Sequence, residues 1–238
     1  MSDHAVRAGS FGAGAEAYAR GRPSYPPAAL RACLPSWPAR RVLDLAAGTG
    51  KLTEGLLALG LPVVAVEPLA EMRALIDRRA EVLDGRAEAI PLPDASVDAV
   101  LVGQAFHWFD RAPALAEIVR VLRPGGTVGV LWNLLDDRVG WVAAVADAFA
   151  AEDRHSNLAE ADAPWSDVAG LSEPEALLFE HDQPADAEVL VDNIASRSTV
   201  ILAPAAERAA VLERVRAAAP PGRFTIPYAC HVWRAARA

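Results

Sequence analysis

Short apolar runs alternate with helical periodicities between residues 41 and 132, and this alternation limits the possible folds more than any other feature of the chain. The β-prone run 41–45 passes through a glycine-bearing turn at 46–50 into leucines at helical spacing, and the pattern stops at Gly60. Such alternation is typical of a mostly parallel sheet with helices on both faces, because parallel strands need crossover connections. We therefore expect a doubly wound α/β fold, with strands at 41–45, 63–66, 82–83, 97–102, 128–132, 177–180 and within 224–233, and with helices containing 52–59, 72–79, 115–122 and 211–215.

Composition narrows the class of protein. The 238 residues are 53% hydrophobic and 23% charged, which is enough apolar material for one sizeable core. The net charge of -8 argues against the broad basic surface on which nucleic-acid binding depends. The chain shows neither a signal-peptide pattern nor an apolar run long enough for a membrane span, and Cys33 and Cys230 lack CxxC spacing. We expect a cytoplasmic protein that binds neither nucleic acid nor a membrane; the sequence leaves its oligomeric state open.

The chain is expected to form one domain without internal repeats. Its regular alternation breaks down between residues 133 and 175, where Trp141 and Trp165 occur in a stretch rich in Ala and Asp. These tryptophans either line a pocket or form the hydrophobic core of a lid. The expected segments are an N-terminal arm at 1–40, a cofactor-binding core at 41–132, a helical lid at 133–175, and C-terminal strands and a helix at 176–238.

The glycine turn at 46–50 lies at the carboxyl edge of the expected sheet, where ligands of such folds bind. A P-loop would need Ser or Thr where Leu52 stands and glycine where Leu45 stands, so that interpretation fails. A dinucleotide fingerprint starting at Gly48 would need Gly or Ala where Thr53 stands, which weakens that interpretation without excluding it.

Two acidic residues accompany the turn. Glu67 closes the second expected strand, where a carboxylate can accept hydrogen bonds from both hydroxyls of an unphosphorylated ribose. The alternative is that Glu67 merely caps the helix that begins at Pro68. Asp44 lies in an otherwise apolar strand end, where an unpaired carboxylate is costly. Its expected partner is either a backbone amide of the turn or a ligand amine reached through water.

Five motifs in chain order resemble those of the class I S-adenosylmethionine-dependent methyltransferases. They are VLDLAAGTG at 42–50, VEP at 66–68, RAEAIPLPD at 86–94, SVDAV at 96–100 and LRPGG at 122–126. GRPSYP at 21–26 and QAFHWF at 104–109 further resemble a small-molecule subgroup that includes enzymes similar to trans-aconitate methyltransferases. The resemblance implies a Rossmann-like, mostly parallel seven-stranded sheet whose last strand is antiparallel.

The resemblance also implies S-adenosylmethionine as the cofactor. Family members often have glycine where Ala46 stands. Many also have Asp where Arg86 stands, and unlike Asp the arginine side chain cannot accept a hydrogen bond. We therefore expect adenine to contact the Ala87 amide, with Glu88 as a helper, and Arg22 to pair with a carboxylate of cofactor or substrate. The full expected set of cofactor contacts is Asp44, Ala46, Gly48, Gly50, Glu67, Pro68, Ala87, Glu88, Gln104 and Phe106, with Tyr18 and Arg22 from the arm.

Methyl transfer from a sulfonium is an in-line displacement that needs no metal and no covalent nucleophile, and none of the five histidines has HxxxH spacing. The expected acceptor is a small molecule, with oxygen or a carboxylate most favoured. A hydroxyl or amine acceptor needs a base, and His107 is the candidate; otherwise His107 packs on Trp108. A carboxylate acceptor needs none. The competing functions are an NAD(P)-dependent oxidoreductase and a non-catalytic module that binds S-adenosylmethionine.

Overall fold

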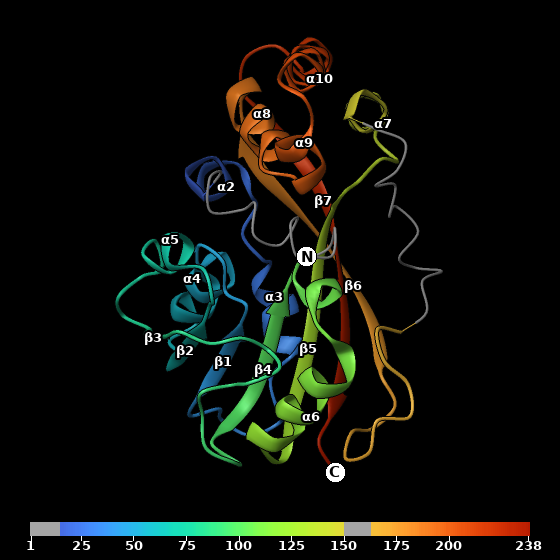
Figure 1. Cartoon of the computed structure of the whole chain (residues 1–238). Coiled ribbons are helices and arrows are strands. Elements are labelled where there is room, and N and C mark those ends of the chain that lie inside the picture. The colour runs from blue at the N-terminus through green and yellow to red at the C-terminus, as the bar shows by residue number, and fades with distance from the viewer. Residues whose placement is uncertain (1–14, 150–162) are drawn as a thin grey trace. The chain divides into compact units, whose positions relative to one another are not determined.

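The computed structural model describes residues 15–149 and 163–238, and its centre is a seven-stranded sheet in the order β3-β2-β1-β4-β5-β7-β6 (Figure 1). Strands β1 to β5 are parallel to one another, and β7 is antiparallel. This confirms the expected doubly wound, Rossmann-like sheet. The strands are β1 (Val42–Leu45), β2 (Val63–Val66), β3 (Glu81–Leu83), β4 (Val97–Gly103), β5 (Leu122–Leu135), β6 (Glu175–Ala185) and β7 (Phe224–Ala236).

The chain divides into two compact units. The unit that we call the sheet unit holds β1 to β4 and comprises Ser24–Asn133, Glu160–Phe179 and Cys230–Ala238. The unit that we call the helical unit comprises Met1–Pro23, Leu134–Ala159 and Glu180–Ala229. The expected single domain stays a prediction, as does the lid at 133–175. Residues 1–14 of the expected arm and 150–162 of the expected lid lie outside the described residues.

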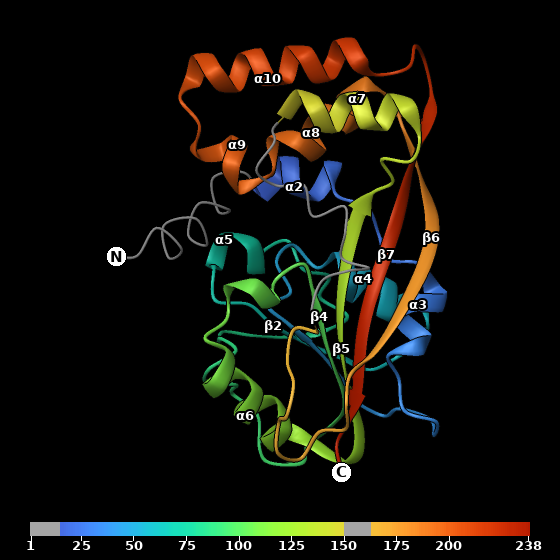
Figure 2. The same cartoon turned by 90° about the vertical axis from the view of Figure 1, so that its right-hand side faces the viewer.

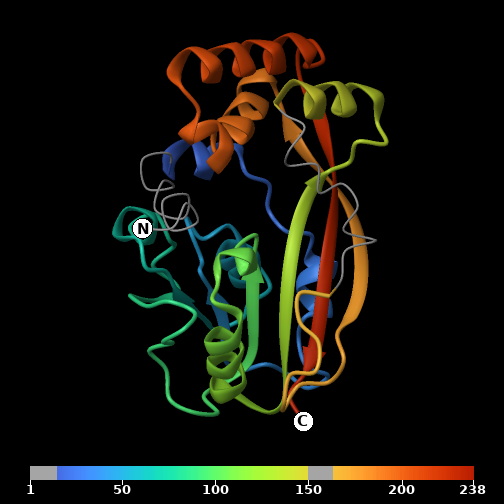
Figure 3. The ribbon, with the colours of Figure 1, turned by 45° about the vertical axis from the view of Figure 1, so that its right-hand side comes forward.

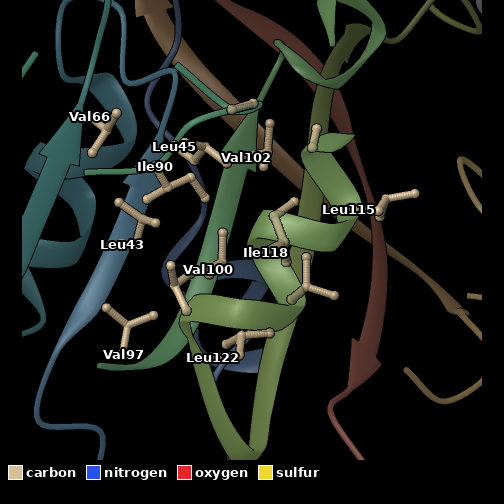
Figure 4. Packing of buried hydrophobic residues seen from close by; sticks show 14 of the residues in the cluster. Leu43, Leu45, Val66, Ile90, Val97, Val100, Val102, Leu115, Ile118 and Leu122 are labelled. Carbon is tan, nitrogen blue, oxygen red and sulfur yellow. The ribbon is translucent and has the colours of Figure 1, made fainter. Parts of the chain in front are cut away.

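Both faces of the sheet unit are covered, and the strand sequences explain why. In β1 and β4 successive residues point to opposite faces, so that Leu43 and Val100 join one apolar cluster while Val42 and Leu101 join another. Helix α6 (Arg111–Val121) covers the first face, where Ile118 is fully buried among the residues of Figure 4. Helices α3 (Pro27–Ala32) and α4 (Lys51–Ala58) cover the second face (Figure 2).

Close packing of α3 on the sheet depends on a small residue. A Cβ on Gly129 of β5 would lie 2.5 Å from the Cys33 sulfur, so only glycine admits Cys33 at this point. Cys33 and Cys230 are both fully buried in the second cluster as free thiols. They therefore behave as small apolar side chains.

The helical unit has an apolar cluster of its own. This cluster includes Val145, Leu190 and Val215, all fully buried. The helices that carry them lie together in Figure 3. Trp141 packs edge-on against Phe224 there, with 5.3 Å between ring centroids, so Trp141 belongs to a hydrophobic core. The described helices are α2 (Ala15–Gly21), α7 (Gly140–Phe149), α8 (Ala187–Ala195), α9 (Ser198–Leu202) and α10 (Ala205–Ala218).

Several element boundaries differ from those expected. Where a helix was expected at 72–79, the structure has only the short helix α5 (Ala70–Arg73). Beyond it, hydrogen bonds between residues three apart tighten the chain up to Ile76, and the Asp77 carboxylate then accepts the Arg79 amide. Strand β5 begins earlier than expected because backbone bonds to Arg237 continue the pairing through the glycine turn at 125–126. Strands β6 and β7 are likewise longer than expected. No helix in the described parts of the chain is both long and apolar enough to span a bilayer.

Candidate cofactor site

The turn between β1 and α4 has a backbone that favours glycine. Gly48 and Gly50 have φ angles of 57° and 90°, in the left-handed region that glycine adopts without strain. Ala46 also has a positive φ, 58°, at the position where the resembling family often has glycine. A Cβ on Gly48 would meet none of the described atoms within 4 Å, so the surface in front of this turn is open. The turn therefore leaves room for a ligand at the carboxyl edge of the sheet.

The amides of this turn are already engaged within the protein. The Gly48 amide donates to the Glu67 carboxylate at 2.8 Å, and the Ala47 amide donates to the Val66 carbonyl at 3.0 Å. The Gly50 amide closes the turn on the Ala47 carbonyl at 2.9 Å. A pyrophosphate bound at such a turn would need these donors for itself. The geometry therefore disfavours a dinucleotide and leaves acceptor oxygens at the edge.

Glu67 joins the ends of two strands and is only 4% exposed. One of its oxygens accepts the Gly48 amide, and the other accepts the Leu69 amide at 2.9 Å, just before α5. Burial raises the pKa of the Glu67 carboxyl, and the two amide bonds oppose that rise. Each oxygen keeps a lone pair, so the carboxylate can hold the helix start and still accept from ribose hydroxyls.

Asp44 is the most unusual side chain of the site. It is 1% exposed, one oxygen accepts the Thr53 hydroxyl at 2.6 Å, and the other oxygen has no hydrogen-bond partner among the described residues. Burial raises the pKa of the Asp44 carboxyl to about 7. The partner in the protein is thus the Thr53 hydroxyl, and the ligand amine expected from the sequence stays a prediction. The buried Thr49 hydroxyl also lacks a partner among the described residues.

These orphaned polar atoms fit S-adenosylmethionine. The ligand carries an amine and two ribose hydroxyls, which are donors that buried acceptors such as Asp44 Oδ1 lack. The open space at Gly48 and the acceptor lone pairs of Glu67 lie at the same edge, since β1 and β2 are parallel neighbours. In contrast, no group of His, Cys, Asp or Glu that could hold a metal ion occurs in the described ranges 15–149 and 163–238.

Two residues of this site were missed in the sequence. Thr53 holds Asp44, although in the sequence it counted only as a departure from a dinucleotide fingerprint. Arg73 donates from one nitrogen to the carbonyls of Glu67 and Pro68, at 2.7 and 2.9 Å, and its other terminal nitrogen lies 3.2 Å from Asp84. Arg73 thereby fixes the Glu67–Pro68 peptide. The available signal was an arginine on the helix that directly follows Pro68.

The loop expected to meet adenine is packed into the sheet unit. Ala87 is 3% exposed, and Arg86 projects from the loop with a side chain that is 71% exposed. Glu88 accepts the Asp110 amide at 3.0 Å, so one of its oxygens serves the protein itself. The Ala87 and Glu88 assignments stay predictions.

The segment after β4 carries three other candidates. Gln104 has a φ of 58°. Its backbone amide donates to the Leu131 carbonyl at 2.9 Å, and its side-chain amide donates to the Asn133 carbonyl at 2.7 Å. Phe106 is 1% exposed and packs against Phe109 and Trp165, so Trp165 belongs to a hydrophobic cluster. The exposed His107 has its ring centroid 4.4 Å from that of Trp108. Contact of these residues with a ligand stays a prediction.

Tyr18 and Arg22 belong to the helical unit. Arg22 lies over the Tyr18 ring at 4.9 Å and donates to the Ser196 hydroxyl at 2.9 Å. The preceding carbonyl, that of Gly21, accepts from the Asn193 and Gln183 amides. The end of α2 is thus held by side chains of its own unit, and the expected pairing of Arg22 with a carboxylate stays a prediction.

Comparison with known proteins identifies the family. The methyltransferase domain family matches residues 43–130. An uncharacterized methyltransferase of Mycobacterium tuberculosis is 46% identical over 215 residues, covering 87% of this chain and 84% of that protein. Among solved structures, a putative type II methyltransferase from Anaeromyxobacter dehalogenans is similar, with a TM-score of 0.62, 26% identity and coverage of 91% of this chain and 97% of that one.

A more distant relative names an activity. The malonyl-[acyl-carrier protein] O-methyltransferase of Methylococcus capsulatus is 39% identical over 99 residues, which cover 37% of this chain and 36% of that protein. The family match excludes the oxidoreductase alternative and the non-catalytic one. It agrees with the hydrogen bonds that already occupy the turn amides, which disfavour a dinucleotide. The chain belongs to the class I S-adenosylmethionine-dependent methyltransferases.

Proposed function

We propose that this methyltransferase acts on an oxygen atom of a small molecule, either a carboxylate or a hydroxyl, by direct in-line displacement. The observation that carries the choice of oxygen is the partial likeness to an O-methyltransferase. The exposed side chain of His107, on the segment that follows β4, supplies the base that a hydroxyl acceptor needs. The motifs GRPSYP and QAFHWF support a place in the small-molecule subgroup similar to trans-aconitate methyltransferases.

The residues of the sheet unit have distinct tasks in this proposal. When bound, S-adenosylmethionine supplies a methyl group that is already activated by its positively charged sulfur. Glu67 accepts hydrogen bonds from the ribose hydroxyls, and Asp44 meets the cationic end of the ligand with the oxygen that the protein leaves unpaired. Gly48 keeps the edge open, and the Ala87 amide meets the adenine.

The remaining candidates serve orientation and proton removal. Gln104 and Phe106 shape the site beside the methionine half, and Gln104 is held for this by its bonds to β5. Pro68 and Ala46 complete the walls. For a hydroxyl acceptor a ring nitrogen of His107 takes the proton; for a carboxylate acceptor His107 has no proton to remove.

The test is a single-turnover assay with methyl-labelled S-adenosylmethionine against panels of carboxylic acids, alcohols and amines. We expect label to enter an acid or an alcohol. Treatment of the product with base separates the two, because methyl esters release labelled methanol and methyl ethers do not.

The same assay with His107→Ala assigns the proton. With an alcohol acceptor the variant should lose most of its rate, and with a carboxylate acceptor it should keep it. Glu67→Ala serves as the control that weakens cofactor binding. Label found only on nitrogen or carbon would contradict the proposal.

A further inference from the structure

Two side chains of helix α6 hold the loop 86–94 by its backbone. Glu117 accepts the Ile90 amide at 2.8 Å, and Arg120 donates to the carbonyls of Ile90 and Leu92 at 3.0 and 2.8 Å. Both backbone groups of Ile90 are therefore bound by one helix. Because helices bury mainly apolar faces, two charged side chains turned to the main chain of a distant loop need a reason beyond packing.

The two side chains form one unit. Arg120 donates to both oxygens of Glu117, at 2.6 and 2.7 Å, and also pairs with Asp94 at 2.8 Å. The side chains of Glu117 and Arg120 are only 21% and 30% exposed. The hydrogen bond from Arg120 is the main reason why the pKa of the Glu117 carboxyl lies below its ordinary value. Bidentate, charge-assisted bonds of this kind fix geometry as well as adding energy.

The loop is held again at its other end, by the start of the same helix. The amide of Asp110, the residue before α6, donates to the Glu88 carboxylate at 3.0 Å. The Ile90 side chain is buried in the cluster of the sheet unit that Figure 4 shows, together with Ile118 of α6. Ala87 precedes Glu88 directly and is 3% exposed. The position of its amide therefore follows the position of α6.

We propose that Glu117 and Arg120 are positioning residues for the adenine end of the cofactor, acting through the backbone of loop 86–94. This rests on the proposed contact between the Ala87 amide and adenine. A binding loop that is already ordered before the ligand arrives loses less conformational entropy on binding, so the pair contributes affinity without touching the ligand. It also sets how well the site distinguishes adenine from other bases.

The chain offers a matched control three residues further along, at the start of β5. Arg123 pairs with the buried Asp98 at 2.6 Å, with its side chain 41% exposed, and this pair makes no contact with loop 86–94 that the structure records. Arg120→Met and Arg123→Met each remove a guanidinium from a carboxylate and keep the apolar stem. The melting temperatures of the two variants then measure how much stability the loss of an ion pair costs, separately from any effect on cofactor binding.

The experiment measures binding of S-adenosylhomocysteine and of S-inosylhomocysteine by calorimetry. In the inosyl analogue ring N1 carries a hydrogen, so this atom cannot accept a bond from the Ala87 amide. In Arg120→Met the Kd for S-adenosylhomocysteine should rise about tenfold, the effect of roughly one misplaced hydrogen bond, whereas Arg123→Met should stay within about twofold of wild type. The Kd for S-inosylhomocysteine should change far less in both variants. Glu117→Ala should weaken binding like Arg120→Met, and Glu117→Gln should restore part of it, because the amide oxygen can still accept the Ile90 amide.

Hydrogen exchange supplies a readout that does not depend on ligand. The amides of residues 87–90 and of Leu92 should exchange faster in Arg120→Met than in the wild type, and in Arg123→Met their exchange should be unchanged. Equal S-adenosylhomocysteine affinity in the wild type and Arg120→Met would overturn the positioning role while leaving the cofactor site intact. Failure of the wild type itself to bind S-adenosylhomocysteine would overturn both.

Discussion

Replacing Asp44 by a neutral residue should stabilise the ligand-free protein relative to the wild type, and this difference in unfolding free energy should grow as the pH rises. The native carboxyl titrates at about 7, against an ordinary value of 3.8, because burial penalises its ionised form. Between these two pH values the native state holds a proton that the unfolded state has released, so raising the pH destabilises the native state. Above both values the penalty is on the order of 4 kcal/mol, since each unit is worth about 1.4 kcal/mol.

The perturbation is Asp44→Asn, which keeps the size of the side chain and an acceptor for the Thr53 hydroxyl. The assay is urea unfolding of both proteins between pH 5 and pH 8 at constant ionic strength. Over this range the wild type should lose about 2.5 kcal/mol of unfolding free energy relative to the variant. Other titrating groups such as His181 and His231, whose pKa values burial lowers, are common to both proteins and cancel in the difference.

A difference in stability that stays constant from pH 5 to pH 8 would refute the reasoning, because it would mean that Asp44 ionises as it does in the unfolded chain. The variant should also bind S-adenosylhomocysteine more weakly. Together the two results would show that the unpaired oxygen of Asp44 serves the ligand at a cost to the stability of the free protein.

Three further predictions concern single side chains. Glu67→Ala should weaken S-adenosylhomocysteine binding by about 1 to 3 kcal/mol in calorimetry, because charge-assisted bonds to ribose are lost; an unchanged affinity would exclude the ribose role. Tyr228→Phe should lower the unfolding free energy by about 1 to 3 kcal/mol, because the buried Tyr228 hydroxyl bonds both Asn193 and Gln183; a melting temperature equal to that of the wild type would contradict this. Cys230, whose pKa burial raises to about 12, should react with a thiol reagent at pH 8 only after unfolding; rapid labelling of the native protein would contradict its burial.

The strands around the site could be predicted because their sequences carry the signal locally. Val63–Val66 and Val97–Gly103 are buried on both faces of the sheet, so they read as continuous apolar runs. The left-handed turn at Gly48 and Gly50 follows from residue type. The acidic end of β2 was likewise visible, because Glu67 interrupts an apolar run. The fold therefore followed from patterns within a few residues, whereas the cofactor class followed from the resemblance of five motifs to a known family.

What could not be predicted depends on partners distant in the sequence. Strand β6 alternates between exposed and half-buried residues, so its length is set by pairing rather than by its own composition. Arg120 looks like an ordinary surface arginine until the fold brings the Ile90 carbonyl to it from 30 residues away. Thr53 shows its role only when α4 places its hydroxyl against Asp44. Such contacts are consequences of topology, which local periodicity does not contain.

A crystal structure of the complex with S-adenosylhomocysteine tests the central claim most directly. We expect both ribose hydroxyls within hydrogen-bond distance of the Glu67 carboxylate and the adenine beside the Ala87 amide. A ligand bound away from the carboxyl ends of β1 and β2, or ribose hydroxyls turned away from Glu67, would contradict the account.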